Sequence, residues 1–159
     1  MKSNSKTKRL NILIISHEFS PYLGSECAIG WNIIRRIGNF HDVTVLYAET
    51  NQFGTKNYRN NYYKYTKENG LLIGVNPIAI KQPRITKCLV RFNKRISKDL
   101  TTVGFPPLFI LGYKYWQYDA YKKAKILASR KTYDVVHQLT NIHFSEPGYL
   151  WKLGIPLVW

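Results

Sequence analysis

Short runs of apolar residues recur along this chain of 159 residues, and longer segments with helical periodicity separate them. The first run, LNILIIS at 10–16, has no polar alternation, which is typical of a strand that is buried on both faces of a parallel sheet. Pro77 cannot donate a ladder hydrogen bond, so its strand is expected at a sheet edge or with a bulge. The predicted strands are 10–16, 42–47, 71–80, 133–139 and 155–159.

Apolar residues at helical spacing predict helices between these strands. In the first helix, Ser25 can cap the start, and Gly38 is expected to end it in a left-handed conformation. Segment 50–69 is predicted to be a loop followed by a short helix that stops at Asn69 and Gly70. The other predicted helices are 26–37, 84–103, 108–130 and 145–153. The buried stripe of 108–130 is expected to contain Tyr113, Trp116, Ala120, Ala124 and Leu127. This alternation predicts an α/β fold with a Rossmann-like, doubly wound parallel sheet.

The composition is that of a folded and strongly basic protein. Hydrophobic residues make up 45% of the chain, and 24 Lys and Arg face 9 Asp and Glu, which gives a net charge of +15. We expect one domain over 10–159, preceded by a basic N-terminal tail at 1–9. The excess charge favours nucleic acid, an anionic membrane or phosphorylated ligands as partners, and composition alone does not choose among them.

Neither a membrane span nor a secretion signal is predicted. The longest uncharged stretch, 100–113, is shorter than the roughly 20 apolar residues that a spanning helix needs. The N-terminal apolar run is too short for a signal peptide. Cys27 and Cys88 lack the spacing of a zinc site or a disulfide framework. These patterns predict a cytoplasmic protein with reduced thiols and no bound metal.

The first candidate site is the turn between the first strand and the first helix. Gly24 lets a ligand approach the backbone, and the free N–H groups around Ser25 and Glu26 would point at an anion. Ligands of open α/β sheets bind at this carboxyl edge. The alternative is an ordinary glycine-containing loop, in which Glu26 only complements the helix dipole. No GxGxxG or GxxxxGK[ST] motif occurs, which disfavours a dinucleotide site and a P-loop NTPase.

The second candidate is His137, which is expected near the same edge of the sheet. Its imidazole could contact a substrate hydroxyl or a transferred group. Thr140 and Asn141 extend this edge, and His17 has a similar position after the first strand. The alternative is a hydrogen-bonded core histidine. No serine or cysteine nucleophile motif accompanies these histidines, which excludes a hydrolase triad.

The third candidate is the helix at 84–103, which is expected to carry a basic face opposite an apolar stripe. Such a helix beside the uncharged 104–113 segment is typical of an interfacial membrane anchor. The alternative is a solvated face over a core-facing stripe. Nucleic acid is not expected as a partner, because no known recognition motif occurs. The basic residues are Arg84, Lys87, Arg91, Lys94, Arg95 and Lys98, and the apolar ones are Ile85, Cys88, Leu89, Phe92, Ile96 and Leu100.

Three motifs together resemble the amino-terminal half of family 4 glycosyltransferases, which have the GT-B fold. They are GSExAxGWN at 24–32, WQxxAYxxAxxL at 116–127, and YDVVHQLT followed by LWKLGIPLVW. The resemblance covers nearly the whole chain. It implies a retaining, metal-independent enzyme that has no cofactor and uses a nucleotide-sugar donor as substrate. It also implies that Gly24 and Ser25 face the donor phosphates, and that His137 and Thr140 line the acceptor side of the cleft.

The resulting hypothesis is an acceptor-side domain that adds sugar to a cell-surface polysaccharide or a lipid-linked acceptor. We expect it to work at the inner face of the cytoplasmic membrane, with a carboxy-terminal Rossmann domain holding the nucleotide beyond this amino-terminal fragment. His137 is the expected catalytic residue. The alternative from another class is a non-enzymatic basic module that binds anionic membrane or nucleic acid.

Overall fold

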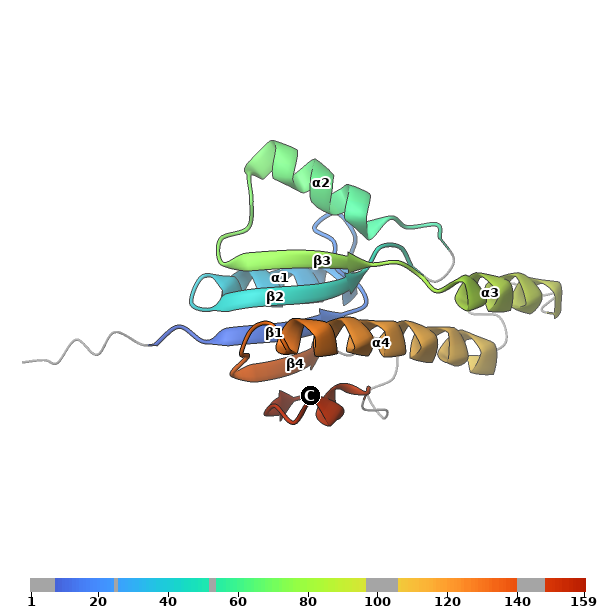
Figure 1. Ribbon diagram of the computed structural model, residues 1–159. Helices are drawn as coiled ribbons and strands as arrows, with labels where there is room; N and C mark the ends of the chain where they lie inside the picture. The colour runs from blue at the N-terminus through green and yellow to red at the C-terminus, as the bar shows by residue number, and fades with distance from the viewer. Residues whose placement is uncertain (1–7, 25, 52–53, 97–105, 140–147) are drawn as a thin grey trace, which may run out of the picture.

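The computed structural model describes residues 8–24, 26–51, 54–96, 106–139 and 148–159. In this part of the chain, five parallel strands form one sheet in the order β3-β2-β1-β4-β5 (Figure 1). This arrangement confirms the predicted α/β, Rossmann-like fold. The strands are β1 (Asn11–Ser16), β2 (Asp42–Ala48), β3 (Val75–Ile80), β4 (Val135–Leu139) and β5 (Leu157–Val158).

Helices flank this sheet, as the doubly wound prediction requires. α1 and α4 lie on opposite faces, and α3 packs against α4 beyond the carboxyl ends of the strands (Figure 1). β3 is an edge strand, as Pro77 predicts. The helices are α1 (Glu26–Gly38), α2 (Tyr58–Asn69), α3 (Arg84–Ile96) and α4 (Pro106–Ala128), and a short 3₁₀ helix, η1, covers Leu150–Leu153.

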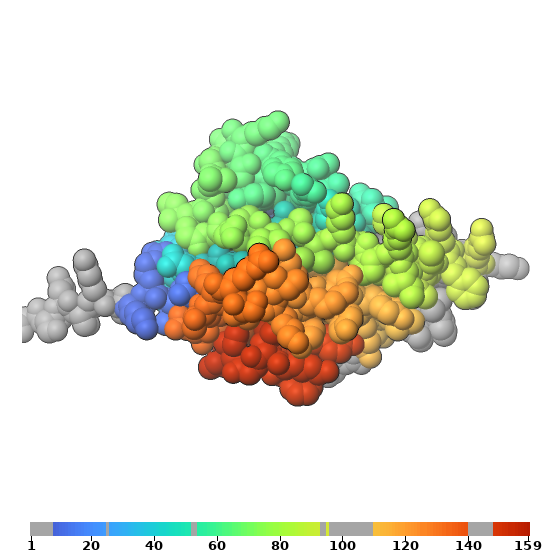
Figure 2. Space-filling view, viewed as in Figure 1, coloured from blue at the N-terminus to red at the C-terminus, as the bar shows by residue number. Residues whose placement is uncertain are grey.

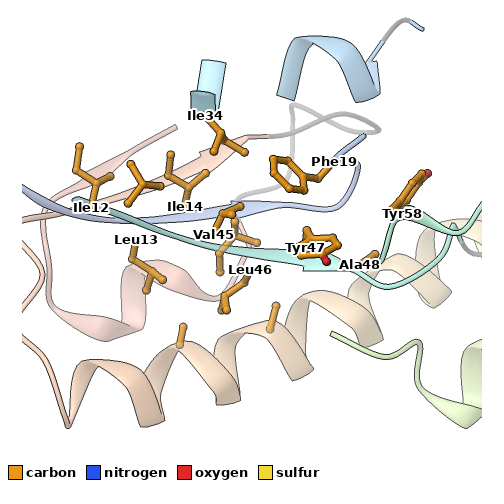
Figure 3. Close-up of a cluster of buried hydrophobic side chains, with 14 of the residues drawn as sticks. Ile12, Leu13, Ile14, Phe19, Ile34, Val45, Leu46, Tyr47, Ala48 and Tyr58 are labelled. Atoms are coloured by element: carbon orange, nitrogen blue, oxygen red, sulfur yellow. The ribbon is translucent and has the colours of Figure 1, made fainter. Parts of the chain in front are cut away.

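The core forms where these helices meet the two sides of the central strands. Figure 3 shows Ile14 pointing to the side of α1 and its Ile34, whereas Leu13 and Leu46 point toward α4. All four side chains are fully buried. The predicted stripe of α4 is confirmed, since Tyr113, Trp116, Ala120 and Ala124 are buried and Leu127 is half-buried. Alternate residues of β1 and β2 therefore supply two apolar layers, as expected for a strand without polar alternation.

Glycines end three of the helices, but for different reasons. Gly70 ends α2 as predicted, with φ of 81° and ψ of −177°, and Gly154 ends η1 in the left-handed conformation, with φ of 69°. The prediction for Gly38 is wrong, because its φ is not positive. A Cβ on Gly38 would lie 2.4 Å from Val75 Cγ2 and 2.6 Å from the Ile73 carbonyl oxygen. Close approach of the chain before β3, and not backbone handedness, therefore requires glycine there.

Two predicted helices differ from the structure in extent. α3 ends at Ile96, and residues 97–103 of its predicted range lie outside the described residues. The helix predicted at 145–153 is a 3₁₀ turn over Leu150–Leu153, and 140–147 are likewise outside the described residues. Segment 50–69 contains the predicted loop and helix, and the Asn57 side chain caps α2 by accepting from the Asn60 N–H.

Most of the described apolar stripe of α3 is exposed, with Leu89 half-buried, which does not fit the alternative of a core-facing stripe. Ile85 and Phe92 are 42% and 54% exposed, and Cys88 is exposed too. The residue that packs deepest is Thr86, whose hydroxyl donates to the Gly112 carbonyl oxygen of α4 at 3.3 Å. α3 lies at one end of the molecule, where it packs against α4 (Figure 2). The exposed apolar strip therefore lies beside the basic residues.

Candidate functional site

The candidate site lies at the carboxyl edge of the sheet, between β1 and β4. From β1 the chain builds outward through β2 and β3, and it then returns to place β4 on the other side of β1. This reversal of strand order is the topological switch point where α/β proteins bind ligands. The loop 17–24 leaves β1 at this edge, and α1 begins directly after it (Figure 1). Ser25, Thr140 and Asn141, which belong to the predicted site, lie outside the described residues.

Gly24 presents open backbone at the start of α1. It is exposed, its φ is not positive, and a Cβ on it would meet no atom within 4 Å. The fold therefore does not require glycine at this position. Gly30 differs, because its Cβ would lie 2.8 Å from the Glu18 carbonyl oxygen and 2.9 Å from Ser16 Oγ. The absence of a side chain at Gly30 is what lets α1 pack closely on the end of β1.

Two carboxylates flank the start of α1. Glu18 Oε2 accepts a hydrogen bond from Cys27 Sγ at 2.9 Å. Burial and this bond raise the pKa of Cys27 to about 12, so the thiol stays protonated and donates. Burial and the nearby charge of Glu18 raise the pKa of Glu26. The sequence pattern does not single out Glu18, although it follows the first strand by only two residues.

This combination of groups suits a ligand that carries hydroxyls. The N–H groups of the first turn of a helix bind oxygen atoms of a ligand. Carboxylates only accept hydrogen bonds, so Glu18 and Glu26 can pair with ligand hydroxyls. They also oppose a bare phosphate, because like charges repel. The positive charge of Lys56, which lowers the pKa of Glu26, offsets part of this repulsion.

His17 is buried on the α4 side of the sheet. It is 1% exposed, and its ring packs edge-on against Trp116 and Tyr113, with centroids 4.7 Å and 5.2 Å away. Its Nε2 lies 3.1 Å from Nε2 of Gln82, which also donates to the Thr50 carbonyl oxygen at 2.9 Å. An amide nitrogen only donates, so His17 Nε2 accepts and the ring proton sits on Nδ1. His17 has no surface open to a ligand in this conformation.

The His17 cluster leaves three polar atoms without a partner. They are His17 Nδ1, Gln82 Oε1 and Trp116 Nε1. Unpaired buried polar groups destabilise a fold, and placing a further charge in such a buried site costs additional free energy. Burial lowers the pKa of His17 to about 3, so the imidazole is neutral at pH 7. The sequence pattern does not identify Gln82 as part of this cluster, because it follows β3 in a loop.

Acid should destabilise the protein through His17. Its pKa is about 3 when folded and 6.5 ordinarily, so below pH 6.5 the unfolded chain binds a proton that the folded chain excludes. Stability is full above pH 6.5 and falls toward pH 3, by up to about 1.4 kcal/mol per pH unit. Urea unfolding at pH 7.0 and 5.0 measures this loss. The variant His17→Phe should lose clearly less between the two pH values, and an equal loss would contradict the assignment.

His137 is not brought together with His17. It pairs with Ile14 of β1 and Val158 of β5, so it lies on the α1 side of the sheet, two residues before β4 ends. It is half-buried, and burial lowers its pKa, which leaves an imidazole that is neutral at pH 7. The sequence places both histidines near one edge, and the structure places them on opposite faces.

α2 holds the loop 17–24 in position. Asn61 Nδ2 donates to Ser20 Oγ at 2.9 Å, and Lys64 Nζ lies 4.9 Å from the centre of the Tyr22 ring. The Tyr22 hydroxyl also bonds to Glu68. The polar segment 50–69, whose sequence pattern is weak, thus fixes the loop that precedes α1.

The basic residues of α3 form a second candidate surface. Arg84, Lys87, Arg91 and Arg95 are exposed, whereas the Lys94 side chain and Lys98 lie outside the described residues. No helix in the described part of the chain is long and apolar enough to cross a bilayer. The described residues also contain no group of three or more His, Cys, Asp or Glu side chains that could hold a metal ion.

Comparison with known proteins leaves the description at the level of the fold. No protein-family model matches this chain, and no curated protein matches its sequence. What stands on the geometry alone is a Rossmann-like α/β domain, with an open turn at its switch point and a basic helix beyond it.

Proposed function

We propose that this chain is the acceptor-side domain of a GT-B glycosyltransferase. It takes a sugar from a nucleotide-sugar donor, with retention and without a cofactor, and transfers it to a cell-surface polysaccharide or a lipid-linked acceptor. The observation that carries this proposal is the switch point between β1 and β4, where the open Gly24 turn meets the start of α1. The three sequence motifs that resemble family 4 glycosyltransferases add support.

Each group at this edge has a role in the proposed reaction. The N–H groups of the first turn of α1 contact the donor diphosphate and stabilise it as it departs. Glu18 and Glu26 accept hydrogen bonds from sugar hydroxyls around it. His137 is neutral at pH 7 and holds the acceptor hydroxyl. His17 is a positioning residue, because it is buried against α4 at the start of the loop that carries Glu18.

In this proposal a carboxy-terminal Rossmann domain supplies the nucleotide site. A cleft between two domains is a common place for a small-molecule site. The chain of 159 residues should therefore bind nucleotide-sugars weakly and show no turnover by itself. Turnover by this chain would contradict the two-domain cleft.

An NMR titration of the ¹⁵N-labelled chain tests this site. UDP-glucose and GDP-mannose at millimolar concentration should shift the amide signals of 17–24 and of the first turn of α1. Gly24→Val should remove these shifts, because a β-branched side chain fills the open backbone. Asn32→Val, on the exposed side of the same helix, is the matched control and should keep them.

The alternative function predicts a different titration. A non-enzymatic basic module would leave these signals unchanged with every nucleotide-sugar. It would instead bind RNA or DNA with an affinity that falls steeply with salt. That pair of results would replace the glycosyltransferase proposal.

The proposal also includes a site of action at the inner face of the cytoplasmic membrane. On α3, exposed basic residues lie beside exposed Ile85 and Phe92. Each basic residue near an anionic surface contributes about 1 kcal/mol, so four contribute about 4 kcal/mol, or roughly millimolar affinity. Inserting an apolar side chain adds about 1.5–3 kcal/mol at most. Together these terms suffice for reversible docking of a helix that lies in the membrane surface.

Co-sedimentation with vesicles tests the docking. Changing Arg84, Lys87, Arg91 and Arg95 to Gln should weaken binding to phosphatidylglycerol vesicles at least about tenfold. A control with the same loss of charge changes the exposed residues Arg35, Arg36, Lys67 and Lys125 to Gln and should bind nearly as well as the unmodified chain. Equal losses in both variants, or equal binding to neutral vesicles, would show that α3 is only a solvated helix.

A further inference from the structure

A concave surface lies on the solvent side of α4, outside the site at the strand ends. It is a groove of about 330 Å³, lined by Leu111, Lys114, Tyr115, Tyr118 and Tyr149. Leu111, Lys114 and Tyr115 belong to the first half of α4, Tyr118 lies just past its middle, and Tyr149 precedes η1. α4 runs antiparallel to the strands, so its first half lies toward their carboxyl ends (Figure 1). We call this surface the tyrosine groove.

Aromatic rings from two distant parts of the sequence meet at the tyrosine groove. The rings of Tyr118 and Tyr149 pack edge to face with centroids 5.5 Å apart, and Tyr121 lies 6.2 Å from Tyr149. Tyr115 and Tyr118 are nevertheless 37% and 46% exposed. These contacts hold the rings of Tyr118 and Tyr149 in place, while Tyr115 and the remaining face of Tyr118 stay open to solvent. A rigid aromatic wall of this kind presents contact area at low entropy cost.

Lysine side chains lie beside the groove. Lys122 Nζ lies 5.0 Å from the centre of the Tyr118 ring, and Lys152 Nζ lies 5.4 Å from that of Tyr149. None of the residues that line the groove is acidic, and Asp119 nearby is paired with Lys122. Asp119 therefore offsets the charge of Lys122, and an anionic group at the Tyr149 end of the groove would be attracted by the Lys152 ammonium.

The lining distinguishes between possible ligands. Among the described residues that line the groove, Leu111 is the one aliphatic side chain, so an acyl chain or an apolar helix would bury little matching surface on them. Phenol rings offer apolar faces with polar edges, and they suit a ligand that has both characters. A pyranose ring has C–H faces and a rim of hydroxyls, and a uronic acid adds a carboxylate for Lys152. The volume accommodates a single sugar ring with part of its neighbour.

We propose that the tyrosine groove binds one residue of an acidic saccharide. This inference rests on the proposed function, because the saccharide is the acceptor chain whose growing end lies at the switch point. The groove holds that chain at a point separate from the reacting sugar. Its contribution is to affinity for the acceptor, and none of its residues touches the reacting atoms.

Titration with trigalacturonate at low ionic strength tests the inference. The amide signals of 111–118 should shift in the ¹⁵N-labelled chain, with a millimolar dissociation constant that rises with salt. Tyr115→Ala and Tyr118→Ala should each weaken binding at least fivefold. The matched control is Tyr63→Ala, which removes a tyrosine that is 49% exposed and also has a cation, Arg59, over its ring at 5.4 Å. This control should bind like the unmodified chain.

Each other outcome overturns the inference. Equal binding of maltotriose would remove the requirement for an acidic saccharide. Shifts of 111–118 with phosphatidylglycerol vesicles and none with trigalacturonate would assign the groove to lipid. Loss of binding in Tyr63→Ala would show general contact with exposed tyrosines. The nucleotide-sugar titration reports on 17–24 instead, so failure of the glycosyltransferase proposal and failure of the groove give separate signals.

Discussion

Trp116→Ala should lower the free energy of unfolding by about 3–5 kcal/mol, which is a large share of the stability of an ordinary domain. Trp116 is fully buried, and it packs on His17 and Tyr113 where α4 covers the sheet. Its removal leaves a cavity that the rigid strands cannot fill. Urea unfolding followed by circular dichroism measures the loss.

Two further variants separate the causes of this loss. Trp151→Ala removes a tryptophan that is 60% exposed and should change stability by less than about 0.5 kcal/mol. Trp116→Phe keeps most of the ring and deletes the indole N–H, which has no partner. It should cost clearly less than Trp116→Ala, because removing an unpaired donor offsets part of the lost packing. Equal losses for Trp116→Ala and Trp151→Ala would contradict the core position.

Gly30→Val should destabilise the protein by about 3 kcal/mol, even though glycine is a poor helix former. The new Cβ would lie 2.8 Å from a backbone oxygen of Glu18, which cannot move without shifting the loop 17–24. α1 must then move away from the end of β1. The NMR signals of 16–18 should shift in this variant.

Gly24→Val is the control for the effect of Gly30→Val on stability. The same side chain at Gly24 meets no atom within 4 Å, so stability should change by less than about 0.5 kcal/mol. The comparison separates a glycine that the packing requires from one that leaves backbone open to a ligand. Similar losses for both variants would contradict the close approach at Gly30.

Sequence patterns predict the fold well because burial on two faces leaves a clear signal. The β-branched runs mark the strands, Pro77 marks the edge strand, and the spacing of Trp116, Ala120 and Ala124 marks the buried side of α4. Each of these features acts within a few residues of the chain. Short-range patterns of this kind are readable without knowledge of neighbouring strands.

The candidate site depends on relations that such patterns do not contain. The parallel register pairs His137 with Ile14, and this pairing, together with the turn of the chain after β1, puts His17 on the other face. The periodicity of α3 separates two sides of the helix but does not say which side α4 covers. Gln82, which contacts His17, is 65 positions away from it in the sequence. Long-range geometry of this kind appears only once the sheet is assembled.

The contacts between α2 and the loop 17–24 couple ligand binding at the loop to local detachment of α2. α2 contributes Tyr58 and Tyr62 to the core, so its detachment from the sheet would expose these two rings. Detachment also breaks the contacts of Asn61, Lys64 and Glu68 with the loop. A ligand that needs the ordered loop therefore also stabilises the closed position of α2. Amide hydrogens of α2 become reporters of binding at a site that they do not touch, through slower exchange with solvent.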